Sequence, residues 1–442
     1  MNAQPAGQQA DEACDVLIVG GGPAGSTAAS FLRRKGWSVL LLEKAQHPRF
    51  HIGESLLPMN LPIFDRLGVM DKVEAMGVPK LAADFECNSE TGYHRFAFDR
   101  ALGKSPGYAF QVCRADFDAM LFRHAREQGA DARQGHKVVS VEHRDARESV
   151  ATVESETGRS YQVRARYVLD ASGRDALLSQ HKKLMRRNTR HQSAAVFGHF
   201  RGALFREGQD RGNISIYRFE HGWMWMIPQP DGSMSVGAVC RPAYLRQRRG
   251  DMREFLMQTI RLNPALHARM ENAQLIDDTV RVAGNYTYDS RQMAGPGWML
   301  IGDAFAFLDP VFSSGVFLAM SGAEQAAEIV DAALRDPACE AALQERMEKK
   351  VRTGMRRFAW FIYRFNSPGM RRLFDQPSNV LDIERGVISM LAGDVFGNGP
   401  VLRRLILFKL IYAALVLINP DSWRWNRRSI AIPMDDGAVP RR

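Results

Sequence analysis

Several features are scarce in this chain of 442 residues, and each absence narrows the class of protein. No two of its five cysteines form a C-x-x-C pair: Cys14, Cys87, Cys113, Cys240 and Cys339. This spacing argues against a disulfide framework and a metal knuckle, so we expect no metal site and a cytoplasmic location. Residues 1–12 lack the basic and apolar regions of a signal peptide, which predicts a flexible N-terminal tail.

The sequence also lacks long apolar runs and an excess of acidic residues. The run 405–418 is broken only by Lys409 and is too short to cross a bilayer. Lys and Arg outnumber Asp and Glu by 59 to 49, giving a net charge of +10, yet nothing resembles a nucleic-acid-binding module. This excess of positive charge would favour binding to an acidic protein or anionic lipid, or it serves only to keep the protein soluble. Hydrophobic content of 45% is typical of a globular protein, and the length suggests two or three lobes.

The stretch 15–43 contains the strongest motif. A short apolar run, 16–19, leads into G-x-G-x-x-G spacing, a helical segment, a second apolar run and then Glu43. Such a turn lets the backbone approach a pyrophosphate at a helix N-terminus, and the acid can bind a ribose. We therefore predict a dinucleotide site that includes Gly20, Gly22, Pro23, Ala24, Gly25, Glu43 and Lys44.

A second sheet is indicated by residues 81–98 and 194–239. Within 221–228, alternation places Trp223 and Trp225 on one face of a strand and Met224 and Met226 on the other. This pattern predicts a mainly antiparallel sheet that could serve as a substrate platform. Tryptophan pairs usually form core, so packing alone is the competing interpretation.

A third informative stretch is 295–330. We predict a strand at 298–301, a turn at 302–304 and a helix from Gly315. Asp303 would then lie at a strand's carboxyl end, where open α/β sheets bind ligands. Free N–H groups at the start of the helix can bind an anion, including a halide.

Other segments carry weaker signals. We expect helices at 56–67, 70–77, 112–130 and 247–273, a hairpin around 157–158, and a strand running into a glycine turn at 166–175. Lys80 by itself suggests a solvated surface lysine. Arg114, at a helix start, could clamp a phosphate or carboxylate, or simply face water.

The chain becomes helical and basic after residue 335. The run 405–418 fits a buried helix. The basic and tryptophan residues that flank it also fit interfacial membrane binding by 403–428. They are Arg403, Arg404, Trp423, Trp425, Arg427 and Arg428.

These patterns predict an α/β fold (α+β overall). We expect a Rossmann-like FAD-binding domain over 13–335, interleaved with a substrate sheet mainly at 81–110 and 194–285, and a helical C-terminal region over 336–442.

Four stretches together resemble the flavin monooxygenase superfamily of the p-hydroxybenzoate hydroxylase type. They are the glycine fingerprint, GESLLP at 53–58, RYVLDASGRD at 166–175 and IGDA at 301–304. W-x-W-x-I-P, formed by Trp223, Trp225, Ile227 and Pro228, is similar to a signature of flavin-dependent halogenases. F-x-x-P-x-x-S-x-G, formed by Phe307, Pro310, Ser313 and Gly315, is similar to another. The resemblance covers about residues 13–330.

The resemblance implies FAD chemistry and roles for particular residues. FAD would contact Arg114, Asp303, Pro310, Gly315 and Val316 in addition to the glycine fingerprint. A chloride or bromide near Ser314 and Gly315 would become hypohalous acid, which Lys80 would hydrogen-bond or carry as a haloamine. Trp223 and Trp225 would separate substrate from flavin. No second nucleotide fingerprint is present, so a partner flavin reductase would supply reduced FAD.

The sequence departs from the tryptophan halogenases at one position. Phe312 stands where those enzymes carry a glutamate, which resembles halogenases of phenols and of carrier-tethered pyrroles. We therefore predict a halogenase for an electron-rich aromatic, bound to an acyl or peptidyl carrier protein or free, and working as a monomer or homodimer. The alternatives are an aromatic monooxygenase using NAD(P)H and a flavin-binding protein without catalytic activity.

Overall fold

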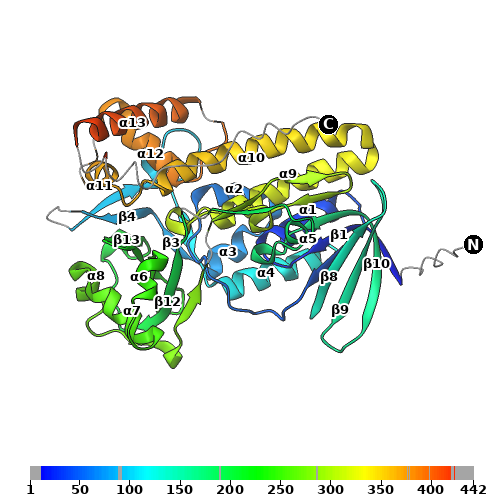
Figure 1. Cartoon of the computed structure of the whole chain (residues 1–442), viewed down its shortest axis with the longest axis horizontal. Helices are drawn as coiled ribbons and strands as arrows, with labels where there is room; N and C mark the ends of the chain where they lie inside the picture. Colours follow the sequence, from blue (N-terminus) through cyan, green and yellow to red (C-terminus); the bar gives the residue numbers. More distant parts are fainter. Residues whose placement is uncertain are drawn as a thin grey trace, which may run out of the picture.

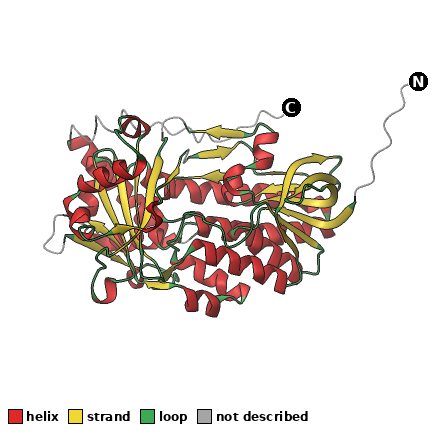
Figure 2. Ribbon diagram, turned by 90° about the horizontal axis from the view of Figure 1, so that it is seen from below, coloured by secondary structure: helices red, strands yellow, loops and turns green. Residues whose placement is uncertain are grey.

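Two large sheets lie toward opposite ends of the molecule, with long helices between and above them (Figures 1 and 2). This computed structural model describes residues 11–87, 92–188, 191–284, 287–375, 377, 379–397, 399–419 and 423. Most of the predicted tail, together with Trp425, Arg427 and Arg428, falls outside these residues.

The first sheet has the strand order β19-β20-β10-β1-β2-β7. Its strands are β1 (Glu12–Val19), β2 (Val39–Glu43), β7 (Asp131–Gln134), β10 (Ser160–Asp170), β19 (Ala294–Gly295) and β20 (Trp298–Leu300). β1 pairs in parallel with both β2 and β10, as its continuous apolar run predicts for a strand covered on both faces. Helices α1 (Pro23–Arg34) and α9 (Gly315–Arg335) pack together beside it. The predicted Rossmann-like α/β unit is confirmed.

Two further strands extend this sheet, β8 (His136–His143) and β9 (Ser149–Ser155). The predicted turn at 157–158 joins β9 to β10, which pair antiparallel. The sequence pattern did not predict a second turn at 144–148, which separates the paired strands β8 and β9.

The second sheet has the order β16-β12-β15-β14-β13-β4-β5, with β17 also on β12. Its strands are β4 (Ala82–Glu86), β5 (Tyr93–Ala97), β12 (Ala194–Arg201), β13 (Ile214–Phe219), β14 (Gly222–Pro228), β15 (Met234–Cys240), β16 (Gln274–Leu275) and β17 (Arg281–Ala283). It is mainly antiparallel, as predicted, although β13 and β4 pair in parallel.

The two faces of β14 bury different side chains. Trp223 and Trp225 join the main core. Met224 and Met226 join a second core. Helices α6 (Pro242–Arg246), α7 (Met252–Arg261) and α8 (Pro264–Arg269) lie beside this sheet in Figure 1. The period-2 pattern thus gave the correct orientation of all four side chains.

Short elements connect the sheets. They are α2 (Leu61–Leu67), α3 (Met70–Met76), β3 (Val78–Lys80), β6 (Ala109–Gln111), α4 (Arg114–Glu127), α5 (Leu177–His181), β11 (Met185–Arg187), β18 (Tyr288–Ser290) and β21 (Ala306–Phe307). The helix expected from residue 56 begins only at Leu61, after a 3-10 turn at Pro58–Asn60. Pro62 lies in its first turn, where a missing N–H breaks no helical bond. β3 pairs with β6, which places Lys80 at the end of a short strand inside the fold.

The C-terminal region is helical, as predicted. It contains α10 (Glu340–Ile362), α11 (Pro368–Asp375), α12 (Ile383–Leu391) and α13 (Gly399–Ile418). Helix α11 packs against β4 and β5, and α13 packs against α11 and α12 (orange and red in Figure 1). Within the residues that the structure describes, no helix has the length and apolarity needed to cross a membrane.

Candidate active site

A cavity of about 750 Å³ opens at the carboxyl ends of the parallel strands. Most of the residues predicted to form the site line it: Gly20, Gly22, Pro23, Ala24, Glu43, Lys44, Arg114, Trp223, Trp225, Asp303, Pro310, Ser314, Gly315 and Val316. Gly25 and Lys80 are not among the lining residues. Segments more than 270 residues apart in sequence therefore meet in one hollow, at the edge where α/β sheets bind ligands.

The glycine turn requires its glycines for steric reasons. Gly20 has φ +102°, and a Cβ there would lie 2.4 Å from the carbonyl oxygen of Ala171. A Cβ on Gly25 would lie 1.9 Å from the carbonyl oxygen of Gly20, so Gly25 supports the turn from behind. Gly22 caps α1 without any side-chain hydrogen bond, which leaves the helix N-terminus open to the cavity. This cradle fits the pyrophosphate of a dinucleotide.

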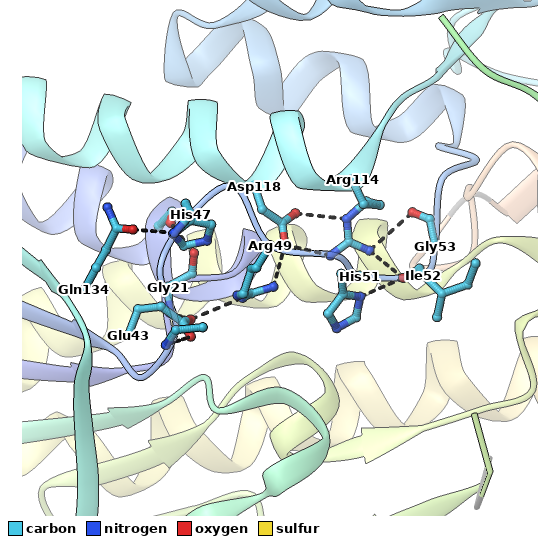
Figure 3. Close-up of polar contacts among 12 residues, drawn as sticks. Gly21, Glu43, His47, Arg49, His51, Ile52, Gly53, Arg114, Asp118 and Gln134 are labelled. Carbon is cyan, nitrogen blue, oxygen red and sulfur yellow. Dashed lines mark hydrogen bonds and ion pairs between the residues drawn. The ribbon is translucent and has the colours of Figure 1, made fainter. Parts of the chain in front are cut away.

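Glu43 lies at the end of β2 in a network that Figure 3 shows. Its carboxylate accepts hydrogen bonds from the N–H of Gly21 at 2.8 Å and from Arg49 at 3.2 Å. Arg49 also pairs with buried Asp118 at 3.3 Å. Burial acts to raise the pKa of Glu43, but Arg49 and the backbone donors outweigh it, so the net pKa is lowered. Glu43 is therefore a carboxylate on the cavity wall, as a ribose acceptor must be.

Arg114 is only 5% exposed, so the interpretation of a helix-end arginine facing water was wrong. Its guanidinium donates to Asp118 at 2.9 and 3.1 Å and to the carbonyl of Ile52 at 2.9 Å (Figure 3). Asp303 lines the same cavity as Arg114. Burial raises the pKa of Asp303 to about 6, although Arg114 and Arg174 act in the opposite direction.

The loop before α9 presents a helix N-terminus to the cavity. A 3-10 turn, Pro310–Phe312, is followed by Ser313 with φ +55°. Ser314 then caps the 21-residue helix without a side-chain cap bond. Free backbone N–H groups and the positive end of the helix dipole favour an anion here, and both Ser314 and Gly315 line the cavity.

Trp223 and Trp225 both pack in the core and line the cavity. Their ring centroids lie 5.7 Å apart. The indole N–H of Trp223 donates to Asp309 at 3.0 Å, and that of Trp225 donates to Ser235 at 3.1 Å. Core packing is therefore shown for both side chains, and their position on the cavity wall leaves the partition role a prediction.

Lys80 is 1% exposed, which shows that the surface interpretation was wrong. Its ammonium donates to Oγ of Ser55 and to the carbonyl of Leu56, each at 2.9 Å, and lies 5.2 Å from the ring centroid of Phe98. Burial lowers the pKa of Lys80 to about 7, with Asp84 acting in the opposite direction. Ser55, not Lys80, reaches the cavity.

Sequence reasoning missed several polar residues of the site. Asp309 is half-buried and accepts from both Trp223 and Ser193, and desolvation raises its pKa. Glu54 is buried and lies 2.6 Å from His199 of β12. The GES triplet drew attention to a loop but gave no roles, and nothing local to residues 193 or 199 indicated their partners.

The comparisons with known proteins agree with this geometry. Residues 13–357 match the family model described as FAD binding domain. Tryptophan 2-halogenase of Chondromyces crocatus is 34% identical over 86% of this chain and 73% of its own length. A 1H-pyrrole-2-carbonyl-[peptidyl-carrier protein] chlorinase of Pseudomonas fluorescens is 30% identical over 96% of this chain and 98% of its own. The structure of the myxobacterial chondrochloren halogenase superposes with a TM-score of 0.76 and 30% identity, covering 93% and 92% of the two chains.

The fold and the cavity therefore define an FAD-dependent oxidoreductase. Within that class, the chain belongs to the flavin-dependent halogenases. The matches support halogenase function rather than the alternative of an NAD(P)H-dependent aromatic monooxygenase.

Proposed function

We propose that this enzyme halogenates a phenolic or pyrrolic ring carried on an acyl or peptidyl carrier protein. The observation that carries the proposal is the placement of Lys80. It is a buried amine with a pKa near 7, one side chain away from a cavity that also presents an anion-binding helix N-terminus. The carrier-protein chlorinase, which matches this chain over nearly the full length of both, supports the substrate class.

Different residues would hold the dinucleotide and the halide. The glycine turn and Glu43 would hold the dinucleotide, and the N–H groups at Ser314 and Gly315 would hold chloride or bromide. When bound, reduced FAD supplies with oxygen the oxidising equivalent that turns the halide into hypohalous acid. We propose that the acid passes the wall at Ser55, which lies between the cavity and Lys80.

Lys80 would complete the transfer. Its neutral amine attacks the halogen of hypohalous acid, forming an N–halogen bond and releasing water. The ring then takes the halogen and loses a proton, which regenerates the amine. A pKa near 7 keeps a large share of Lys80 neutral at physiological pH, as a nucleophile requires.

The residue at position 312 supports an electron-rich ring, rather than free tryptophan, as the substrate. Phe312 is buried and its ring packs edge-on to Phe365 at 5.7 Å. No carboxylate therefore stands at that position to assist proton loss from a less reactive ring. Trp223 and Trp225 would keep the ring away from the flavin.

Further proposals concern partners, oligomeric state and location. A separate reductase would supply reduced FAD, and an acidic carrier would be attracted by the net charge of +10. The wide spacing of the five cysteines fits a cytoplasmic enzyme. Homodimer formation stays a prediction that sedimentation velocity would test. Contact of 403–428 with a membrane surface is a separate proposal.

The test combines purified enzyme, a flavin reductase, NADH, oxygen and bromide with pyrrole-2-carboxyl and 4-hydroxyphenyl substrates, each free and loaded on a carrier protein. We expect a brominated carrier-bound product whose mass depends on bromide. Bromination of free substrate only would overturn the carrier proposal. A hydroxylated product without halide dependence would overturn the proposed reaction.

A further inference from the structure

Exposed apolar side chains concentrate in the C-terminal helical layer. Among the described residues, eight of the twelve exposed large hydrophobic side chains lie between positions 380 and 423: Val380, Leu381, Ile406, Leu410, Ile411, Leu417, Ile418 and Trp423. The other four are far apart in sequence: Phe50, Leu204, Leu262 and Val282. Single exposed apolar residues are ordinary, but a cluster of this size marks an interaction surface.

Helix α13 provides most of this cluster, and its two sides have different surroundings. The inner side is buried against α11 and α12 by Val401, Leu405, Phe408, Tyr412 and Val416. Tyr412 also packs on Trp360 of α10, with ring centroids 5.3 Å apart. This side anchors the helix to the enzyme, so α13 cannot leave the fold without exposing a core.

The opposite side is what we call the outer face of α13: Ile406, Leu410, Ile411, Ala413, Ala414, Leu417 and Ile418, all exposed. Leu410 is 62% exposed and Leu417 is 80% exposed. Spacings of three and four residues align these side chains along one side of the helix. The sequence left open whether this helix is buried or interfacial, and the structure shows one buried side and one exposed apolar side.

The outer face carries a basic residue at its N-terminal end. Arg403 is exposed on α13 and, three and seven residues before Ile406 and Leu410, lies on the same side of the helix. From residue 340 to 419 there are thirteen Lys and Arg against seven Asp and Glu. More than half of the net charge of the whole chain thus belongs to this layer.

We propose that the outer face of α13 binds the surface of an anionic membrane, with the helix lying in the plane of the interface. Leucine and isoleucine side chains would enter the boundary between headgroups and acyl chains, while Arg403 contacts phosphate and other anionic headgroups. Two copies paired through the same face would bring two C-terminal layers of like net charge together, which costs electrostatic energy. Lipid satisfies both the apolar stripe and its charge. This surface is separate from the cavity, so the proposal does not depend on the proposed substrate.

Vesicle flotation of the full chain loaded with FAD tests the proposal. The vesicles contain phosphatidylcholine alone, or an equimolar mixture with phosphatidylglycerol. The test variant is Leu410→Glu with Leu417→Glu. The matched control is Leu204→Glu with Leu262→Glu, which makes the same change at two isolated exposed leucines in the other lobe. Circular dichroism and the flavin spectrum verify that both variants fold.

We expect binding to the anionic vesicles that falls by roughly tenfold or more in the α13 variant and stays unchanged in the control. Arg403→Gln should weaken binding to anionic vesicles and reduce its salt dependence. Absence of binding to either vesicle would overturn the proposal, as would equal loss in both double variants. A wild-type dimer in sedimentation velocity that dissociates only in the α13 variant would overturn it in favour of a second copy. Carrier-protein binding that requires Leu410 and Leu417, without vesicle binding, would overturn it as well.

Discussion

Nζ of Lys80 lies 2.9 Å from Oγ of Ser55, and of these two residues only Ser55 lines the cavity. The proposed catalytic amine is thus separated from the cofactor cavity by a single small side chain. This arrangement keeps the amine dry, which lowers its pKa, while leaving it one hydrogen bond from the space where hypohalous acid would form.

Replacing Lys80 by alanine should abolish halogenation without loss of FAD. The side chain lies outside the cavity lining, so the flavin spectrum and the affinity for FAD should be unchanged. We expect the rate of halide incorporation to fall by on the order of 10²-fold or more. The matched control is Lys104→Ala, which removes an exposed lysine and should leave the rate unchanged. Retained halogenation in Lys80→Ala would remove the assigned role.

Burial of Lys80 also makes a prediction about stability. Because the pKa of Lys80 is lower in the folded state than its ordinary value of 10.5, the unfolded chain binds more protons between about pH 7 and 10.5. The cost of burying the ammonium is therefore full below pH 7 and is relieved as the pH rises through this window. Lys80→Met removes the cost and leaves only a pH-independent change from the lost hydrogen bonds.

The free energy of unfolding of wild type and Lys80→Met should be compared by urea denaturation at several pH values. Relative to the variant, the wild type should gain about 1 kcal/mol or more between pH 7 and about pH 9. A difference that does not change with pH would show that the amine keeps its ordinary pKa.

The sequence predicted the parts of this protein that local patterns encode. The parallel strands, the glycine turn and the alternation at Trp223 to Met226 follow from spacing alone, because each depends on residues close in the chain. Motif resemblance added a role for Lys80 and a halide at the predicted helix N-terminus. These are the features for which residue type and position are sufficient.

Burial and pairing across distant segments could not be predicted in this way. Lys80 is enclosed because β3 pairs with β6, and Arg114 is enclosed because the loop at 52–53 folds over it. Asp309 accepts a hydrogen bond from Trp223, which is 86 residues away in sequence, so no local pattern indicated this pairing. The outer face of α13 also required the structure, since an almost entirely apolar helix gives no periodic signal of which side is covered.

The hydrogen bond from Trp223 to Asp309 should couple the two residues energetically. Burial raises the pKa of Asp309, and the indole N–H of Trp223 is one of three donors to this carboxylate, beside Ser193 and the N–H of Val311. Loss of one donor therefore weakens the compensation of the buried charge. In a double-mutant cycle with Trp223→Phe and Asp309→Leu, we expect a coupling free energy of about 1 kcal/mol or more. Urea unfolding measures it. Additive effects of the two substitutions would contradict the coupling.

Gly25→Ala should abolish FAD binding, because the added Cβ would lie 1.9 Å from the carbonyl oxygen of Gly20. The turn must then move, and the helix N-terminus moves with it. Gly399→Ala, at a position with no atom within 4 Å of the added Cβ, is the control and should bind FAD as the wild type does. Titration of apoprotein with FAD by flavin fluorescence separates the two variants. Equal affinity in both would mean that the turn relaxes without loss of the site.

The hydroxyl of Ser55 should set the pH at which the enzyme becomes active. Its oxygen accepts a hydrogen bond from the ammonium form of Lys80, which favours the charged state. Ser55→Ala removes this acceptor, so the pKa of Lys80 should fall by about one unit. If the neutral amine takes the halogen, the wild-type rate rises through about pH 7 and the alanine variant reaches half its maximal rate at a lower pH. Ser55→Thr retains the hydroxyl and should keep the wild-type midpoint. A rate that falls as the pH passes 7 would mean instead that the ammonium form acts, by donating a hydrogen bond to hypohalous acid, and Ser55→Ala would then lose activity at a lower pH than the wild type.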